Sequence, residues 1–383
     1  MKIDTQSFIK VSQILERDSK DASYKFALMR ATIDVISLFD QHIISSENKV
    51  IIPTGLIIER WLWYYYPLID SEIFLPQKNS EPEILTRGRN IAFRKHFNLL
   101  IEEYSKVGNY KQFYNDYKKK NLSSEVNILL LNLVLKLYET ITNQPMKFIG
   151  KSISRSEYSI YKRESGRNGI VNNQKVTTEL LIKKFGTFSI PSDYYLVLKY
   201  LGSFIGGENA ILNKWADFVV AANRNFAIDK SYILSQLSIK PESFRDVSAV
   251  DQFFKNKQNL RCVWSGKKIT GGHLNIDHIL PFAHYLNNDV WNLLPTLDTV
   301  NNKKRDKIPT PDFIENRKNI IIDYWFELKN HFQKGFEEEI RISLSPNINF
   351  NSDRNWEISA LNSLKNKAEF LINIRGLDEW SLL

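Results

Sequence analysis

The 383-residue sequence has almost no cysteine, since Cys262 is the only one. A single thiol excludes an intramolecular disulfide and fits a protein that works in the reducing cytosol. The first residues, Met1 to Ser7, lack the apolar stretch that a secretory signal needs. We therefore expect a cytoplasmic protein.

Long hydrophobic runs are also missing. The most apolar stretch, residues 51–69, is interrupted by Pro53, by the charged pair Glu59-Arg60 and by Pro67. This stretch is too short and too charged to cross a bilayer, so the sequence predicts no membrane partner. We find no internal repeat and no low-complexity tract.

The chain is rich in core-forming residues and in positive charge. Apolar residues make up 43% and aromatic residues 13%, enough for buried cores over two or three domains. The formal net charge is +9, which favours a polyanionic partner without proving one.

Residues 1–145 are predicted to form a helical N-terminal domain for target recognition, dimerisation or partner binding. Phe26, Met29, Ile33 and Ile36 recur at helical spacing after a candidate cap at Ser23. The aromatic run Trp61–Tyr66 can stack on bases, but a core or a partner interface is the stronger interpretation.

Several basic groups outside residues 251–311 can contact phosphate, and the alternative for each is a solvated surface. They are Arg87, Arg89, Arg94, Lys95 and His96 on a helix predicted to reach Tyr104, the run Lys118-Lys119-Lys120, and Lys162, Arg163 and Arg167 beside a Gly/Asn-rich loop. The last set belongs to a predicted mixed middle region, residues 146–250, which becomes helical again after Pro191.

Residues 251–311 carry the pattern that points to chemistry. The order is Arg261–Gly266, a glycine-containing turn, Leu274–Pro281, Val290–Pro295 and Val300–Arg305. We interpret it as strand, turn, strand, loop and short helix, the helix being capped by Thr296 or Asp298. Thr310-Pro311 then begins a C-terminal helical region, residues 312–383. The predicted fold class is therefore α+β.

Phosphodiester hydrolysis needs a base for water and a cation for the developing negative charge. His278 can be that base, while the oxygens of Asp277 and Asn301 suit Mg²⁺ or Mn²⁺. Neighbours on a strand point to opposite faces, so Asp277 and His278 need a twist or bulge to share a site. The basic side chains predicted to hold DNA are Lys303, Lys304 and Arg305 on the short helix and Lys267 and Lys268 in the turn.

Residues 261–309 resemble the HNH (ββα-metal) endonuclease family. The shared positions are Asp277-His278 with Pro281, Asn292-Leu293, Asn301 nine residues later and Lys304 three residues after that. The resemblance implies that His278 is the general base, that Asp277 and Asn301 bind the metal, and that the catalytic-site residue Asn292 braces the loop that orients His278. It also implies DNA as the substrate, and the tract around Asp277 is similar to HNH proteins of restriction and phage defence.

One departure from the family concerns zinc. Many members bind a structural zinc ion through two Cys-x-x-Cys pairs, whereas the matching positions here hold Cys262, Ser265, Leu297 and Val300. One thiolate cannot form a tetrahedral site, so we expect no structural zinc and apolar packing in its place.

The sequence therefore predicts a DNA endonuclease, and the alternative is a catalytically silent HNH-fold protein that binds nucleic acid or acts as a scaffold. One centre cuts one strand at a time, so a homodimer or a companion subunit is expected for double-strand breaks. Candidate dimer surfaces are Trp61–Tyr66 and the helix from Pro311. His273 is expected to be exposed, and the role of His284 stays open.

Overall fold

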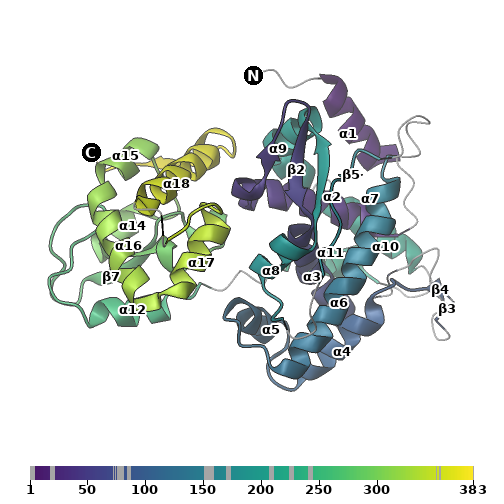
Figure 1. The fold of residues 1–383 in the computed structure, drawn as a ribbon, viewed down its shortest axis with the longest axis horizontal. Coiled ribbons are helices and arrows are strands. Elements are labelled where there is room, and N and C mark those ends of the chain that lie inside the picture. Colours follow the sequence, from purple (N-terminus) through teal and green to yellow (C-terminus); the bar gives the residue numbers. More distant parts are fainter. Residues whose placement is uncertain are drawn as a thin grey trace. The chain divides into compact units, whose positions relative to one another are not determined.

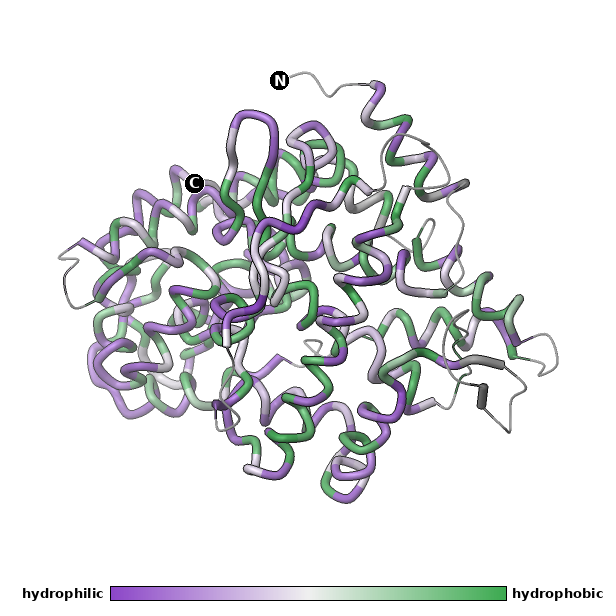
Figure 2. The backbone as a smooth tube through the Cα atoms, turned by 45° about the vertical axis from the view of Figure 1, so that its right-hand side comes forward, coloured by the Kyte–Doolittle hydropathy of each residue, from purple (hydrophilic) through white to green (hydrophobic). Residues whose placement is uncertain are grey.

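The computed structural model describes residues 5–17, 22–71, 73, 75, 82–83, 88–150, 159–169, 174–206, 211–223, 228–239, 245–350, 352 and 355–382. The chain forms two compact units, Met1–Pro241 and Glu242–Leu383 (Figure 1). Along most helices hydrophobic and hydrophilic residues alternate, as amphipathic packing around a core requires (Figure 2).

The first unit is mostly helical and includes one four-stranded sheet. Its helices are α1 (Thr5–Arg17), α2 (Tyr24–Leu38), η1 (Asp40–His42), α3 (Thr54–Asp70), α4 (Arg94–Ser105), α5 (Asn109–Lys118), α6 (Ser124–Asn143), α7 (Pro145–Phe148), α8 (Thr178–Lys184), α9 (Ser192–Gly206), α10 (Asn213–Ala222) and α11 (Lys230–Ser238). Its strands are β1 (Ile44–Ser45), β2 (Lys49–Pro53), β3 (Pro82–Glu83), β4 (Gly88–Arg89), β5 (Lys162–Arg163) and β6 (Thr187–Pro191).

The sheet joins two segments that the sequence analysis treats separately. Its order is β1-β2-β6-β5 with antiparallel pairing, and Val50 pairs with Ile190. Strands β1 and β2 come from the predicted helical segment 1–145, while β5 and β6 come from the predicted mixed segment 146–250. The functional division into four segments stays a prediction, but these two share one sheet and one compact unit.

The aromatic run Trp61–Tyr66 lies on α3 and is buried along its whole length. Trp63 packs edge-on against Tyr117 at a centroid distance of 5.2 Å, and Tyr66 stacks with Phe113 at 5.6 Å. Base stacking and dimerisation through this run are therefore wrong as interpretations, because it forms the core of the first unit. Aromatic side chains of this size supply a large part of a core's buried area.

In the second unit, helices surround a short pair of antiparallel strands. Its elements are α12 (Ser248–Lys255), β7 (Leu274–His278), α13 (Phe282–Tyr285), η4 (Val290–Asn292), β8 (Leu293–Leu297), α14 (Asp298–Lys304), β9 (Ile308–Pro309), α15 (Pro311–Asn316), α16 (Lys318–Phe332), α17 (Lys334–Ser343), α18 (Trp356–Asn373) and β10 (Glu379–Trp380). Strand β9 pairs in parallel with β10, which fastens the C-terminal residues to the end of the predicted nuclease segment.

The strand pair differs from the predicted one. Strand β7 forms as predicted, but its partner is β8, a segment that the sequence analysis treats as a loop. Residues 261–263 form no strand, although Arg261 makes an isolated bridge with Lys268 and the Val263 amide donates to the carbonyl of Pro295. Nearly all of β8 is buried, so it shows an apolar run instead of the alternation by which a half-exposed strand is found.

The helices that follow β8 confirm the predicted order with two corrections. Leu297 is the N-cap of α14, so capping by Thr296 or Asp298 is wrong. Thr310 caps α15 as predicted, accepting a hydrogen bond from the Phe313 amide at 3.2 Å. The helical region predicted to begin at Thr310-Pro311 is divided at Arg317 and again at Gln333, which has a φ of 47°.

The α+β fold class is confirmed, since helices dominate and small sheets occur in both units. Among the helices of the described residues, none is both long and apolar enough to cross a membrane.

Candidate nuclease site

Asp277 lies near the end of β7 and is almost fully buried. Its carboxylate accepts from the Lys304 ammonium, with Nζ 3.0 Å from each oxygen, and from the Trp264 indole at 2.6 Å. Burial raises the pKa of Asp277, although Lys304 and Trp264 act in the opposite direction. The buried Asp277 carboxylate is therefore already paired with a cation, the Lys304 ammonium.

Lys304, the last residue of α14, has no exposed surface. It follows the buried Val300 by four residues, and positions four apart share one helix face, which explains why it points inward. Its ammonium also donates to the carbonyl of His278 at 2.6 Å. The predicted contact of Lys304 with DNA is therefore wrong for this structure, because a fully buried ammonium does not reach a phosphate.

His278 ends β7 and is also buried. Its Nε2 lies 3.1 Å from the amide oxygen of Asn288, and its ring packs on Phe282 at 5.3 Å. An amide oxygen only accepts, so Nε2 carries the proton and Nδ1 keeps a free lone pair. Burial lowers the pKa of His278 to about 4, so the ring is neutral at pH 7.

The side chains of Asp277 and His278 have different neighbours. Pairing with β8 is regular through both residues, Asp277 opposite Leu294 and His278 opposite Leu293, so of the twist or bulge that a shared site would need, the bulge does not occur there. Regular pleating directs neighbouring side chains to opposite faces. Lys304 links the two residues, because one ammonium contacts both the Asp277 carboxylate and the His278 carbonyl.

Asn292 is fully buried and holds the segment after His278. Its side chain accepts from the Leu280 amide at 2.9 Å and donates to the carbonyls of Leu280 and Asn287. Its carbonyl also accepts from the Ile279 amide at 2.8 Å. These bonds match the bracing role expected for Asn292, which makes it a positioning residue with no contact to the His278 ring.

The remaining predicted residues lie at or near the surface. Asn301 is half-buried on α14, three residues before Lys304 and hence on a neighbouring part of the same face. Within the described residues its side-chain amide has no hydrogen-bond partner. The basic side chains Lys267, Lys268, Lys303 and Arg305 are exposed, as contact with DNA requires.

The donor set of this site fits a magnesium-type ion. Among the described residues, no three His, Cys, Asp or Glu side chains group together as a metal site. Mg²⁺, however, needs few protein ligands because it keeps several waters and takes substrate phosphate. The amide oxygen of Asn301 is available, and a carboxylate offers about four acceptor positions, of which Lys304 and Trp264 occupy three at Asp277.

Two of the four positions that the sequence resemblance relates to a zinc site, Cys262 and Ser265, form ordinary contacts here. The Cys262 thiol lies 3.2 Å from the Thr296 hydroxyl and accepts from the Ser265 amide at 3.4 Å. Trp264 stacks on Phe313 at 5.6 Å beside these residues. The buried thiol therefore has a hydroxyl and an amide as partners, while the apolar packing is that of the neighbouring Trp264.

The two other histidines of this segment lie outside the buried cluster. His273 is exposed, as predicted, and its Nδ1 lies 2.9 Å from Asp298. His284 is 3.8 Å from Asp306, which gives it a carboxylate neighbour in place of a phosphate.

Two residues of the site were missed by the sequence analysis. Asn288 orients His278, and its place in the run Asn287-Asn288-Asp289 marks only a turn. Arg245 donates to the carbonyl of Ile276 at 2.9 Å, and its charge contributes to the lowered pKa of His278. No sequence signal identifies Arg245, since it precedes the family-like segment.

Comparison with known families agrees with this geometry. A family model described as "Domain of unknown function (DUF8808)" matches residues 4–237, and one described as "HNH endonuclease" matches residues 262–310. No curated protein and no solved structure matches the chain. The second match covers β7, β8 and α14, which together hold Asp277, His278 and Asn301.

Proposed function

The chain belongs to the family described as "Domain of unknown function (DUF8808)", and we propose that its second unit is a metal-dependent DNA endonuclease of the HNH type. The observation that carries the proposal is the hydrogen bond from His278 to Asn288, which leaves Nδ1 as a neutral base at pH 7. A match to an HNH endonuclease model at the same residues supports it.

In this proposal His278 Nδ1 accepts a proton from the water that attacks phosphorus. Asp277 and Asn301 hold Mg²⁺ or Mn²⁺, which when bound offsets negative charge on the phosphate and the leaving oxygen. Asn288 and Asn292 position the base, and Lys304 keeps the Asp277 carboxylate ionised inside the unit.

The exposed cations Lys267, Lys268, Lys303 and Arg305 hold the DNA strand through its phosphates. We assign the enzyme to restriction or phage defence in the cytoplasm, on the similarity of the Asp277 tract to such HNH proteins. A homodimer or a companion subunit then supplies the second cut. Expression in cells challenged with phage tests this role, and equal plaque counts for the wild type and a His278→Ala variant contradict it.

Supercoiled plasmid incubated with the protein tests the chemistry directly. We expect nicked and then linear product with Mg²⁺ or Mn²⁺, and none in EDTA. A single-stranded break should come first because each centre attacks one phosphodiester at a time. Binding of plasmid with no cleavage under any divalent cation would instead identify a catalytically silent DNA-binding protein.

Zinc content provides a further prediction. Purified protein should contain far less than one zinc per chain, because Cys262 is the only thiolate among the four family positions. A Cys262→Ser variant should keep both its fold and its activity. Elemental analysis that finds one zinc per chain, lost in the variant, would overturn this prediction.

The low pKa of His278 predicts a pH dependence of stability in EDTA. The pKa is about 4 in the folded chain and about 6.5 when unfolded, so protonation favours unfolding. This contribution to the free energy of unfolding is fully present above pH 6.5. It falls as the pH drops toward 4, by about 3 kcal/mol in total.

Urea unfolding at several pH values measures this effect. A His278→Gln variant removes the titrating ring and corrects for the other histidines. The stability difference between wild type and variant should shrink steadily below pH 6.5, and parallel curves would show that His278 is not buried as a neutral ring.

A further inference from the structure

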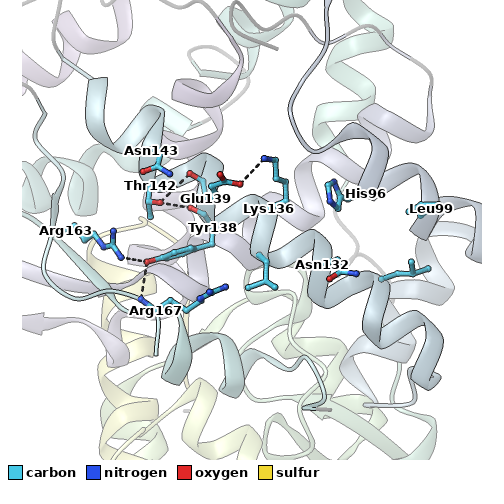
Figure 3. Close-up of a pocket in the computed structure, with 12 residues that line it drawn as sticks. His96, Leu99, Asn132, Lys136, Tyr138, Glu139, Thr142, Asn143, Arg163 and Arg167 are labelled. Atoms are coloured by element: carbon cyan, nitrogen blue, oxygen red, sulfur yellow. Dashed lines mark hydrogen bonds and ion pairs between the residues drawn. The ribbon is translucent and has the colours of Figure 1, made fainter. Parts of the chain in front are cut away.

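The first unit contains a groove that the nuclease chemistry does not use. It has a volume of about 770 Å³ and is lined by α4, by the outer face of α6 and by the loop after β5 (Figure 3). Its lining residues are His96, Leu99, Leu129, Asn132, Leu135, Lys136, Tyr138, Glu139, Thr142, Asn143, Arg163 and Arg167. Two basic segments noted in the sequence, those of His96 and of Arg163, thus meet in one place.

The groove is elongated, because its floor is one face of a helix. Leu129, Asn132, Lys136, Glu139 and Asn143 follow one another at steps of three or four residues along α6. From Leu129 to Asn143 the helix rises by about 21 Å. That length of duplex DNA carries about six phosphates on each strand.

Two arginines lie at one end of the groove, where Tyr138 bonds the side chain of one and the backbone of the other. Arg163 donates to the Tyr138 hydroxyl at 2.8 Å, and the Arg167 amide donates to the same oxygen at 3.1 Å (Figure 3). The Arg163 guanidinium also lies close to Gly166, where a Cβ would be 2.6 Å from its Nη2 atom.

The loop that carries these arginines is fixed on both sides. The amides of Glu164 and Ser165 both donate to the carbonyl of Thr187, at 3.0 and 3.1 Å, and the Asn168 amide donates to that of Lys184. Arg163 itself pairs with Phe188 in the sheet. The Arg163 guanidinium and the backbone at Arg167 are therefore prearranged, which reduces the entropy lost on binding an anion.

The residues that line the groove carry more positive than negative charge. Among its lining residues Glu139 is the only acid, and it already pairs with Lys136 at 2.8 Å. Within the described residues neither Arg163 nor Arg167 contacts a carboxylate, and both are exposed. At the other end His96 lies close enough to Lys136 for that charge to lower the pKa of His96, after the larger effect of burial.

We propose that this groove binds the phosphodiester backbone of duplex DNA, with Arg163 and Arg167 as its phosphate contacts. The row of polar side chains from Asn132 to Asn143, about 17 Å long, fits a polymer better than a single small anion. Arginine presents a planar set of donors that matches phosphate. The choice of DNA rests on the proposed nuclease function, and the role assigned to the first unit is to hold the substrate.

Fluorescence anisotropy with a labelled 30-base-pair duplex tests the proposal. The full chain carries His278→Ala and is kept in EDTA, so that cleavage does not interfere. Adding Arg163→Ala and Arg167→Ala should weaken binding about tenfold near 0.1 M salt and lower the salt-dependence slope by about two. The matched control is Lys106→Ala with Lys183→Ala, which removes the same charge from exposed, ion-paired side chains of the same unit.

Unchanged affinity and slope in the arginine variant, with thermal unfolding like the wild type, would overturn the proposal. So would equal losses in the lysine control, since they would show only a general charge effect. Competition with inorganic phosphate distinguishes a DNA backbone from a small anion as the ligand. We expect millimolar phosphate to leave duplex binding intact. Full displacement of the duplex by phosphate would instead assign the groove to small anions.

This test can fail independently of the nuclease assignment. Loss of affinity in the arginine variant of a protein that never cuts plasmid supports the groove and contradicts the nuclease. If the protein cuts plasmid but its affinity for DNA is unchanged in the arginine variant, the nuclease function is supported and DNA binding by the groove is contradicted.

Discussion

Replacing His278 with alanine should lower the rate of plasmid cleavage by about 10²- to 10⁴-fold, the range in which general bases contribute. His278 is the neutral base that Asn288 holds in one tautomer, with Nδ1 free of protein partners in the described part of the unit. Initial nicking rates at saturating Mg²⁺ measure the loss. Circular dichroism must show that the variant is folded.

Two other variants make this result specific. His273→Ala removes an exposed histidine that pairs with Asp298, and it should leave the rate unchanged. Asn288→Ala frees Nε2 and should lower the rate by about tenfold, as loss of an orienting partner does. A folded His278→Ala protein that nicks as fast as the wild type would remove His278 from the mechanism.

The part of the site that the sequence could predict is local. The order of segments predicted β7 and α14, and a hydroxyl followed by proline predicted the start of α15. These are signals that neighbouring residues carry by themselves. The resemblance added roles for Asp277, His278 and Asn301, which the family match supports at the level of the domain.

The missed features depend on contacts across the fold. Asn288 reaches His278 only after the chain turns through Leu286, a left-handed residue with a φ of 49°. Arg245 comes from outside the family-like segment. Lys304 was misassigned because a run of three basic residues usually marks a solvated surface, although its four-residue spacing from Val300 already placed it on the buried face.

The pair of Asp277 and Lys304 should contribute strongly to the stability of the second unit. Both groups are buried, and burial raises the pKa of Asp277 and lowers that of Lys304, so each charge depends on the other. Lys304→Met leaves an unpaired buried carboxylate, which costs about 3–5 kcal/mol. Calorimetry in EDTA should show a Tm lower by roughly 10–20 °C.

A divalent cation should partly restore the Lys304→Met variant, because the ion takes the place of the lost ammonium beside Asp277. Metal at about a hundred times its Kd adds about 2.7 kcal/mol, so Mg²⁺ should raise the Tm more in the variant than in the wild type. The double variant Asp277→Asn, Lys304→Met has no buried charge to neutralise, so it should be more stable than the single variant and insensitive to Mg²⁺. Lys303→Met controls for the loss of a charge on the exposed side of α14 and should leave the Tm unchanged.

Two outcomes would contradict these expectations. Equal Mg²⁺ responses in the wild type, the single variant and the double variant would show that Asp277 is not a metal ligand. An unchanged Tm in Lys304→Met would show that the buried ion pair is not what stabilises this unit.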